Sequence, residues 1–212
     1  MPNWCVTSYV IEGDSKEVQD LFHKLNGLIE TEASLKKNDL GACPLSKVVE
    51  IFGRKPEKVS CRNELMNLEI DRKGNCLSFI TETAWNDSPE VWELVTSRYK
   101  SLSYYYQAEE SGMEYYVTND SEGNHFPERF IADTWLYGLR YYNNIDGISK
   151  HFEEITSVSV SGIEQLEDKA CDFNCNDEDK FFYIHKFEII NTSEDETVKS
   201  FLSQQPSHKF QN

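Results

Sequence analysis

The residues with the most obvious chemical potential are Cys171 and Cys175, which stand in the acidic stretch DKACDFNCNDED. Thiolates and carboxylates bind metals, but a structural zinc site uses about four nitrogen or sulfur ligands, usually from two closely spaced pairs. This chain has one such pair, and it lacks both the C-x2-C-x2-C spacing of iron–sulfur proteins and the glycine and glutamate of a calcium loop. We therefore predict no metal site. Asp177, Glu178 and Asp179 are interpreted as a solvated acidic loop and as candidate residues of a partner surface.

Pro2 is a second candidate for chemistry, because removal of Met1 would leave an N-terminal proline amine of the kind that tautomerase-like enzymes use as a base. Such a base needs a lowered pKa and cationic groups that hold the substrate, and the sequence assigns none. The five histidines are scattered, and none stands in a nucleophile motif. No glycine-rich phosphate loop is present. The sequence therefore assigns no catalytic residue and no cofactor, and it favours a non-enzymatic protein.

The charge of the chain limits its partners. The 212 residues carry a formal net charge of -16, which argues against direct nucleic-acid binding and against anionic membranes. Residues 1–100 contain 13 basic and 16 acidic residues, whereas residues 101–212 contain 8 and 21. Such an asymmetry is typical either of a solvated acidic surface or of a surface for a basic protein partner.

The apolar segments are too short to target the chain to a membrane. No run approaches the roughly 18 apolar residues of a membrane span. Residues 1–12 lack the basic start of a secretory signal, and Glu12 and Asp14 end the first apolar run early. We therefore expect a soluble cytoplasmic protein, with its six cysteines as free thiols in or near the core.

The first half of the chain has a regular order of predicted elements. Residues 4–12 alternate as a strand, and a helix follows from Asp14 or Ser15 to a stop at Gly27. Trp4 is expected to wedge under the sheet edge or against a helix. Later elements are a short helix over 45–52, a hairpin of 65–70 and 76–83 with Gly74 in its turn, a helix starting at Ser88 and Pro89, and two strands around Gly112.

This order predicts an α+β fold: a ferredoxin-like β-α-β-β-α-β sandwich over residues 1–120, with an added strand. Residues 121–212 are expected to form an acidic α+β extension packed on it, or to continue the same domain. Within the extension we predict strand material over 129–144 with a break at Gly138, a short helix over 146–155, an acidic and partly helical segment over 162–180, and a strand over 180–190. Ser193 is expected to start a last helix.

Two segments resemble a known family. The opening MPNWC, and the later stretch FITETAWNDSPEVWELVTSRYKSLSYYYQAEESGMEYY, are similar to the YubB-type ferredoxin-like domains of plasmids and genomic islands. Thr83, Trp85, Pro89 and Gly112 fall where that family has its threonine, tryptophan, proline and glycine. Where many members carry a Trp-Gly-Thr-Lys-Trp segment, this chain has LEIDRKGNCLSF, so it resembles a divergent member. The resemblance implies a fold and a bacterial mobile-element setting, and it assigns no catalytic residues.

Aromatic residues supply the remaining surface candidates. The tyrosines at 104–106, 115–116 and 141–142 form either an exposed patch for a partner or ordinary cross-strand pairs, and we take Trp85, Tyr105 and Tyr116 as the partner-surface candidates. RNA-recognition domains share the predicted element order, but the segment NCLSFITE lacks their basic-glycine-aromatic pattern. RNA binding is therefore not expected.

These observations leave three functional hypotheses. The leading one is a non-enzymatic protein-binding module of a bacterial mobile element. The second is an inhibitor whose acidic half mimics nucleic acid and occupies the basic groove of a nucleic-acid-binding protein. The third is a small-molecule enzyme with a pocket between the sheet and the extension, which would require a deep cavity with convergent polar groups.

Overall fold

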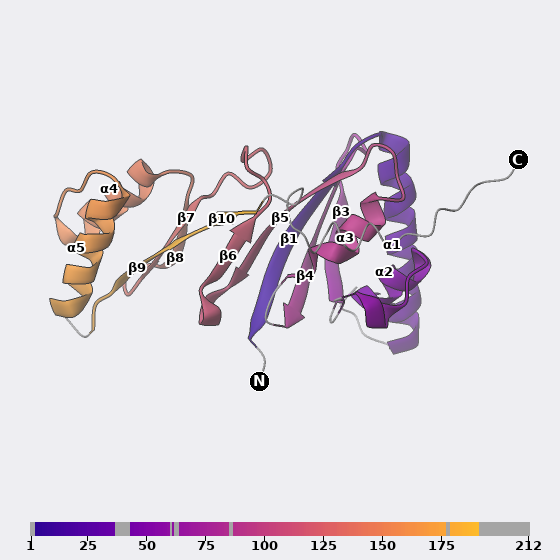
Figure 1. The fold of residues 1–212 in the computed structure, drawn as a ribbon, viewed down its shortest axis with the longest axis horizontal. Coiled ribbons are helices and arrows are strands. Elements are labelled where there is room, and N and C mark those ends of the chain that lie inside the picture. The colour runs from indigo at the N-terminus through magenta and orange to yellow at the C-terminus, as the bar shows by residue number, and fades with distance from the viewer. Residues whose placement is uncertain are drawn as a thin grey trace, which may run out of the picture.

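The structure is a computed structural model that describes residues 3–36, 43–59, 61, 64–84, 87–176 and 179–190. The described residues form a mixed α+β fold with five α-helices and two sheets, one of seven strands and one of three. We call the larger sheet with helices α1–α3 the first unit, and the smaller sheet with α4 and α5 the second unit. The two units lie side by side along the long axis of the molecule (Figure 1).

The centre of the first unit is an antiparallel sheet. Strand β1 (Trp4–Glu12) lies between β4 (Cys76–Ala84) and β5 (Ser103–Glu110), and β3 (Glu64–Ile70) pairs with β4 in the predicted hairpin. Gly74 takes a φ of 73° in the hairpin turn, as the sequence predicts. The full order is β10-β6-β5-β1-β4-β3-β2, with β2 (Cys43–Pro44) and β6 (Tyr115–Thr118) near the edges and β10 (Glu188–Ile189) outermost.

Strand β1 alternates as predicted and so separates two faces of the sheet. Cys5, Tyr9 and Ile11 are buried on the face that α1 (Ser15–Lys36) and α3 (Pro89–Thr96) cover. Figure 1 shows the helices of this unit together on one side of the sheet. Trp4 points to the other face and is 51% exposed, so the expectation that it wedges against a helix is wrong.

Helix α1 starts where the sequence predicts but continues further. The Asp14 carboxylate accepts a hydrogen bond from the backbone N–H of Lys16 at 3.0 Å, and Val18, Leu21 and Leu25 pack into the core. The helix passes through Gly27, whose missing side chain would meet no atom within 4 Å, and ends at Lys36. A solvent-side glycine costs a helix only about 1 kcal/mol relative to alanine, so Gly27 does not stop it.

Short helical segments close the helix side of this unit. The predicted helix at 45–52 is α2 (Leu45–Ile51), followed by Gly53 in the left-handed region at a φ of 80° and by the 3-10 turn η1 (Pro56–Lys58). In α3, Pro89 takes the first turn and Val91, Trp92, Leu94 and Val95 are buried, as predicted. A second 3-10 turn, η2 (Ser111–Met113), connects β5 to β6.

The second unit has its own sheet and core. Strands β7 (Phe130–Thr134), β8 (Gly138–Tyr142) and β9 (Phe182–Lys186) are antiparallel, in the order β8-β7-β9. Helices α4 (Ile145–Thr156) and α5 (Ile163–Asn176) pack on one face through Ile148, Phe152 and Leu166. The break predicted at Gly138 is the start of β8, because that glycine follows the hairpin tip at a φ of 65°. Ser193 lies outside the described residues.

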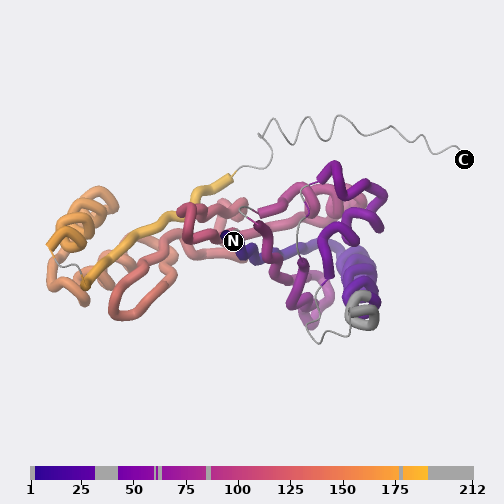
Figure 2. The backbone as a smooth tube through the Cα atoms, turned by 90° about the horizontal axis from the view of Figure 1, so that it is seen from below, coloured from indigo at the N-terminus to yellow at the C-terminus, as the bar shows by residue number. Residues whose placement is uncertain are grey.

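The chain returns from the second unit to the first. Strand β10 pairs with β6 in parallel, through Glu188 with Val117 and Ile189 with Thr118. Figure 2 shows the end of the described chain running back along the second unit to the larger sheet. A small buried cluster of Tyr116, Ile131 and Phe187 fills the junction. Within the described residues, no helix combines the length and the apolar character that crossing a bilayer requires.

Candidate binding groove

The outer face of the larger sheet carries an unusual row of carboxylates. Glu64 of β3 pairs directly with Glu82 of β4. Glu82 also pairs with Val6 of β1, and Val6 in turn pairs with Glu109 of β5. Neighbouring strands lie about 4.8 Å apart, and like charges placed directly opposite each other destabilise a sheet. The row therefore concentrates negative charge on the face that the helices of the first unit leave open.

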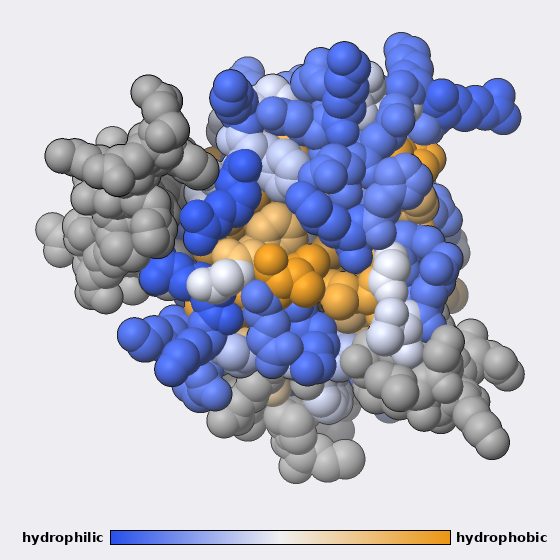
Figure 3. All heavy atoms as spheres, turned by 90° about the vertical axis from the view of Figure 1, so that its right-hand side faces the viewer, coloured by the Kyte–Doolittle hydropathy of each residue, from blue (hydrophilic) through white to orange (hydrophobic). Residues whose placement is uncertain are grey.

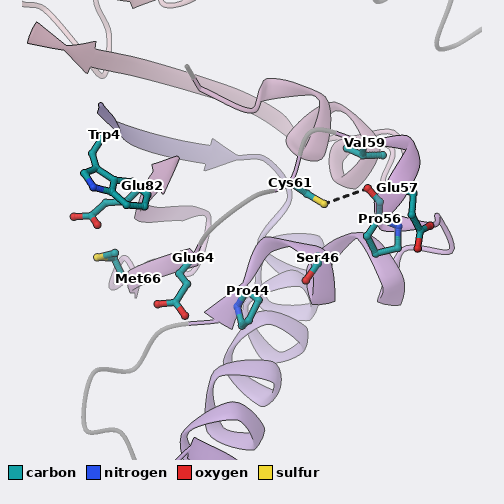
Figure 4. A pocket seen from close by; sticks show the side chains of 10 residues that line it. All are labelled: Trp4, Pro44, Ser46, Pro56, Glu57, Val59, Cys61, Glu64, Met66 and Glu82. Carbon is teal, nitrogen blue, oxygen red and sulfur yellow. Dashed lines mark hydrogen bonds between the residues drawn. The ribbon is translucent and has the colours of Figure 1, made fainter. Parts of the chain in front are cut away.

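A groove of about 860 Å³ lies at one end of this row. Its walls come from β1, β3 and β4 on one side and from β2, the start of α2 and the η1 turn on the other (Figure 4). Glu57, Glu64 and Glu82 line it together with Trp4 and Met66, and none of the 10 lining residues that the structure describes is basic. The groove therefore combines an apolar surface with three carboxylates.

Trp4 gives the groove an aromatic wall. Figure 4 shows its indole beside Glu82 at one end, while Glu57 stands at the other end on the η1 turn. A lysine or arginine head group over an indole face is attracted by the ring quadrupole, and a carboxylate beside the ring adds a charged hydrogen bond. The residues at this end are therefore suited to hold a cationic side chain.

Cys61 lines the groove but is poorly suited to be a nucleophile. Its thiol donates a hydrogen bond to the Pro56 carbonyl at 3.5 Å. Burial, together with Glu57 and Glu50, raises the pKa of this thiol, so the reactive thiolate is disfavoured near neutral pH. The groove therefore lacks an activated nucleophile at this position.

A second cluster of polar groups lies inside the first unit, where α3 begins. The Asp87 carboxylate accepts a hydrogen bond from the Tyr115 hydroxyl at 2.6 Å, and burial raises the pKa of Asp87. Nearby, burial raises the pKa of the Cys5 thiol to about 11. Asp87 is only 5% exposed, so its carboxylate has little access to solvent. We interpret it as a buried anchor between β6 and the start of α3 rather than as a substrate site.

The structure does not bring the predicted partner-surface residues together. Tyr105 and Tyr116 share the outer face of neighbouring strands, but Tyr105 is half-buried against His125, with ring centroids 4.7 Å apart. Tyr116 is buried, 5% exposed, against His185 and Phe187, which corrects the expectation that it is exposed.

Of the acidic candidates, the structure describes Asp179, which belongs to the second unit. Asp179 is exposed just beyond α5, on a different unit from the groove. Trp85, Asp177 and Glu178 lie outside the described residues.

All six cysteines are free thiols. Cys171 and Cys175 are exposed one helical turn apart on α5, in contrast to the expected core position. In the part of the chain that the structure describes, no group of three or more His, Cys, Asp or Glu side chains is arranged to hold a metal ion.

The sequence contained a signal for the groove that composition alone did not reveal. Alternation in β1 places the side chains of Trp4 and Tyr9 on opposite faces of the sheet. If Tyr9 faces the core, the indole of Trp4 is exposed. The pairing of Glu64 with Glu82 depends on the register of the β3–β4 hairpin. A bulge between Met66 and Glu69 shifts this register, and the local sequence pattern does not predict the shift. The walls from β2 and η1 follow only from the tertiary fold.

Comparison of the chain with protein-family models, with curated proteins and with solved structures finds no match.

Proposed function

We propose that this protein is a non-enzymatic binding module whose groove accepts a basic segment of a partner protein. The observation that carries the proposal is the direct pairing of Glu64 with Glu82 in a groove whose described lining residues include three glutamates and no basic residue, beside the exposed ring of Trp4. A lysine or arginine side chain of the partner would lie between the two carboxylates and the indole.

The electrostatics of the free protein support this proposal. Two unit charges at the usual cross-strand spacing of about 5 Å repel each other by about 0.8 kcal/mol in water, and by more where the local dielectric constant is lower. A bound cation replaces that repulsion by two attractions. A basic side chain placed between Glu64 and Glu82 would therefore be attracted by both carboxylates.

A ferredoxin-like arrangement of the first unit belongs to the same proposal. Its support is the antiparallel order β5-β1-β4-β3, with α1 and α3 on one face. This arrangement leaves the other face of the sheet for the groove. Membership in the YubB-type family, a mobile-element setting and a cytoplasmic location stay predictions.

The charge-mimic hypothesis is a narrower form of the proposal. Its support is the Glu64–Glu82 pair, whereas Glu109 further along the row already accepts a hydrogen bond from the Tyr141 hydroxyl at 2.8 Å. In this form the partner is a nucleic-acid-binding protein, and a DNA duplex competes with the module for it. The enzyme hypothesis has less support, because the groove is lined by residues of the first unit rather than by residues from both units.

The experiment is a fluorescence anisotropy titration of a labelled oligolysine peptide with the full chain. We expect Glu82→Gln to weaken binding at least about threefold more than Glu167→Gln, an exposed α5 variant with the same change in net charge. Trp4→Ala should weaken binding as well. Equal effects of the Glu82 and Glu167 variants would mean that the peptide senses only net charge, and would overturn the proposal.

A further inference from the structure

A second cavity, of about 590 Å³, lies on the helix side of the first unit, away from the groove. It is formed by Lys24 of α1, by Ile51, Phe52 and Gly53 at the end of α2, and by Arg98 and Tyr99 beyond α3. Figure 3 faces this side of the molecule and shows apolar side chains gathered at its centre among hydrophilic ones. The volume is in the range of small-molecule sites, about 300–1,000 Å³.

The floor of this cavity is apolar and aromatic. The rings of Phe52 and Tyr99 lie against each other with centroids 6.3 Å apart, and Ile51 is 46% exposed beside them. Ile51 ends α2 and Phe52 caps it, so the turn at Gly53 holds both side chains at the mouth. An apolar ligand body would bury surface that water now covers.

Lys24 is already neutralised at this site. Its Nζ lies 2.6 Å from the Asp20 carboxylate, which raises the pKa of Lys24. The Tyr99 hydroxyl donates to the same carboxylate at 2.8 Å. Lys24 also lies 5.2 Å from the centre of the Tyr99 ring, so it closes one side of the cavity rather than offering a spare charge.

Arg98 supplies the charge that remains. One guanidinium nitrogen donates to the Phe52 carbonyl at 3.3 Å, which holds the group beside the aromatic floor. Within the described residues, no carboxylate forms an ion pair with Arg98. A guanidinium has five N–H donors in a planar fork that matches a carboxylate. Arg98 is exposed, so its remaining N–H donors are accessible to a ligand.

We propose that this cavity binds a small amphipathic carboxylate, with its apolar body on Ile51, Phe52 and Tyr99 and its carboxylate on Arg98. The occupant follows from charge complementarity. The guanidinium would repel a cationic ligand, and a neutral apolar ligand would gain no charged hydrogen bond from it. The site is separate from the acidic groove, so the inference does not depend on the proposed function.

The test uses phenylbutyrate as the probe and its neutral amide, phenylbutyramide, as the matched control. Titration of the isotope-labelled full chain, followed by amide chemical shifts, should move the Gly53 and Tyr99 signals. We expect Arg98→Gln to weaken phenylbutyrate binding about tenfold, as loss of a charged hydrogen bond implies, while the weaker binding of the amide stays unchanged. Lys47→Gln, an exposed α2 change, is the control that should preserve both affinities.

Arg98 also holds the end of α2, so Arg98→Lys serves as the second variant. It keeps the charge but loses the planar fork, and we expect an affinity between those of the wild type and of Arg98→Gln. Equal affinity for the acid and the amide, or shifts that avoid Gly53 and Tyr99, would overturn the proposal. Phenylbutyrate binding as tight in Arg98→Gln and Arg98→Lys as in the wild type would also overturn the proposal.

Discussion

Replacement of Glu82 by glutamine should stabilise the protein while it weakens the binding of a basic peptide. Glu82 and Glu64 are direct cross-strand neighbours, about one strand spacing apart. Two charges at that distance repel each other by about 0.8 kcal/mol in water, and salt reduces this further. We therefore expect Glu82→Gln to raise the free energy of unfolding by about 0.5 kcal/mol, within the usual range for a cross-strand pair.

Urea unfolding at low and at high salt measures this gain, which should shrink as the salt concentration rises. Glu64→Gln should give a smaller gain, because Glu64 also has another interaction that the change would weaken. The double variant should gain less than the sum of the two, because either single change already removes the repulsion. A loss of stability in Glu82→Gln, or a gain that ignores salt, would refute the reasoning.

Three further predictions concern the core and the two units, and each is checked by urea unfolding of the full chain. Gly13→Ala should destabilise the protein by about 1–3 kcal/mol, because the new Cβ would lie 2.7 Å from the Ser101 carbonyl oxygen. Gly27→Ala should instead stabilise the protein by about 0.5–1 kcal/mol, because its Cβ would meet no atom within 4 Å. Equal effects of the two variants on the free energy of unfolding would contradict this reasoning. Burial raises the pKa of Asp87, so the folded state holds this proton more tightly than the unfolded state, and the contribution of Asp87 to stability falls as the pH rises from about 4 through the raised pKa. Asp87→Asn should remove that part of the pH dependence, and an unchanged difference between pH 4 and pH 7 would contradict it. His151 packs among the rings of Tyr142 and Phe182, and burial lowers its pKa. Its contribution to the free energy of unfolding is therefore fully present above about pH 6.5 and is lost as the pH falls below that value. His151→Phe should flatten this loss, and a profile like that of the wild type would rule out His151 as its source.

The elements of the first unit were predictable because each has a strong local signal. The alternation over residues 4–12, the glycine in the hairpin turn and Pro89 at a helix start are all confirmed at the same residues. Gly27 misled because a glycine marks a helix end only when the chain must turn there. In α1 the backbone continues, and Gly27 is simply an exposed position on a long helix.

The candidate sites were less predictable, because they join residues that are distant in the sequence. The groove joins Trp4 to Glu57 and Glu82, and the second cavity joins Lys24 to Phe52 and Arg98. Alternation gives the face of each residue but not its neighbour on another strand or helix. The aromatic candidates show the same limit, because Tyr116 is buried by the second unit through His185 and Phe187, and no pattern near Tyr116 indicates this.

The parallel pairing of β10 with β6 has a consequence for how the molecule is divided. Residues 119–187 leave the larger sheet after β6, and the chain rejoins it at the same edge in β10. The second unit is therefore an insertion joined to the sheet by two adjacent connections, rather than a C-terminal extension joined by a single connection. A chain cut once inside the insertion would keep both of its pieces attached to the sheet. Both connections of the second unit therefore lie at the same edge of the larger sheet, and a chain that stops at residue 120 would lose the outermost strand of the first unit along with the insertion.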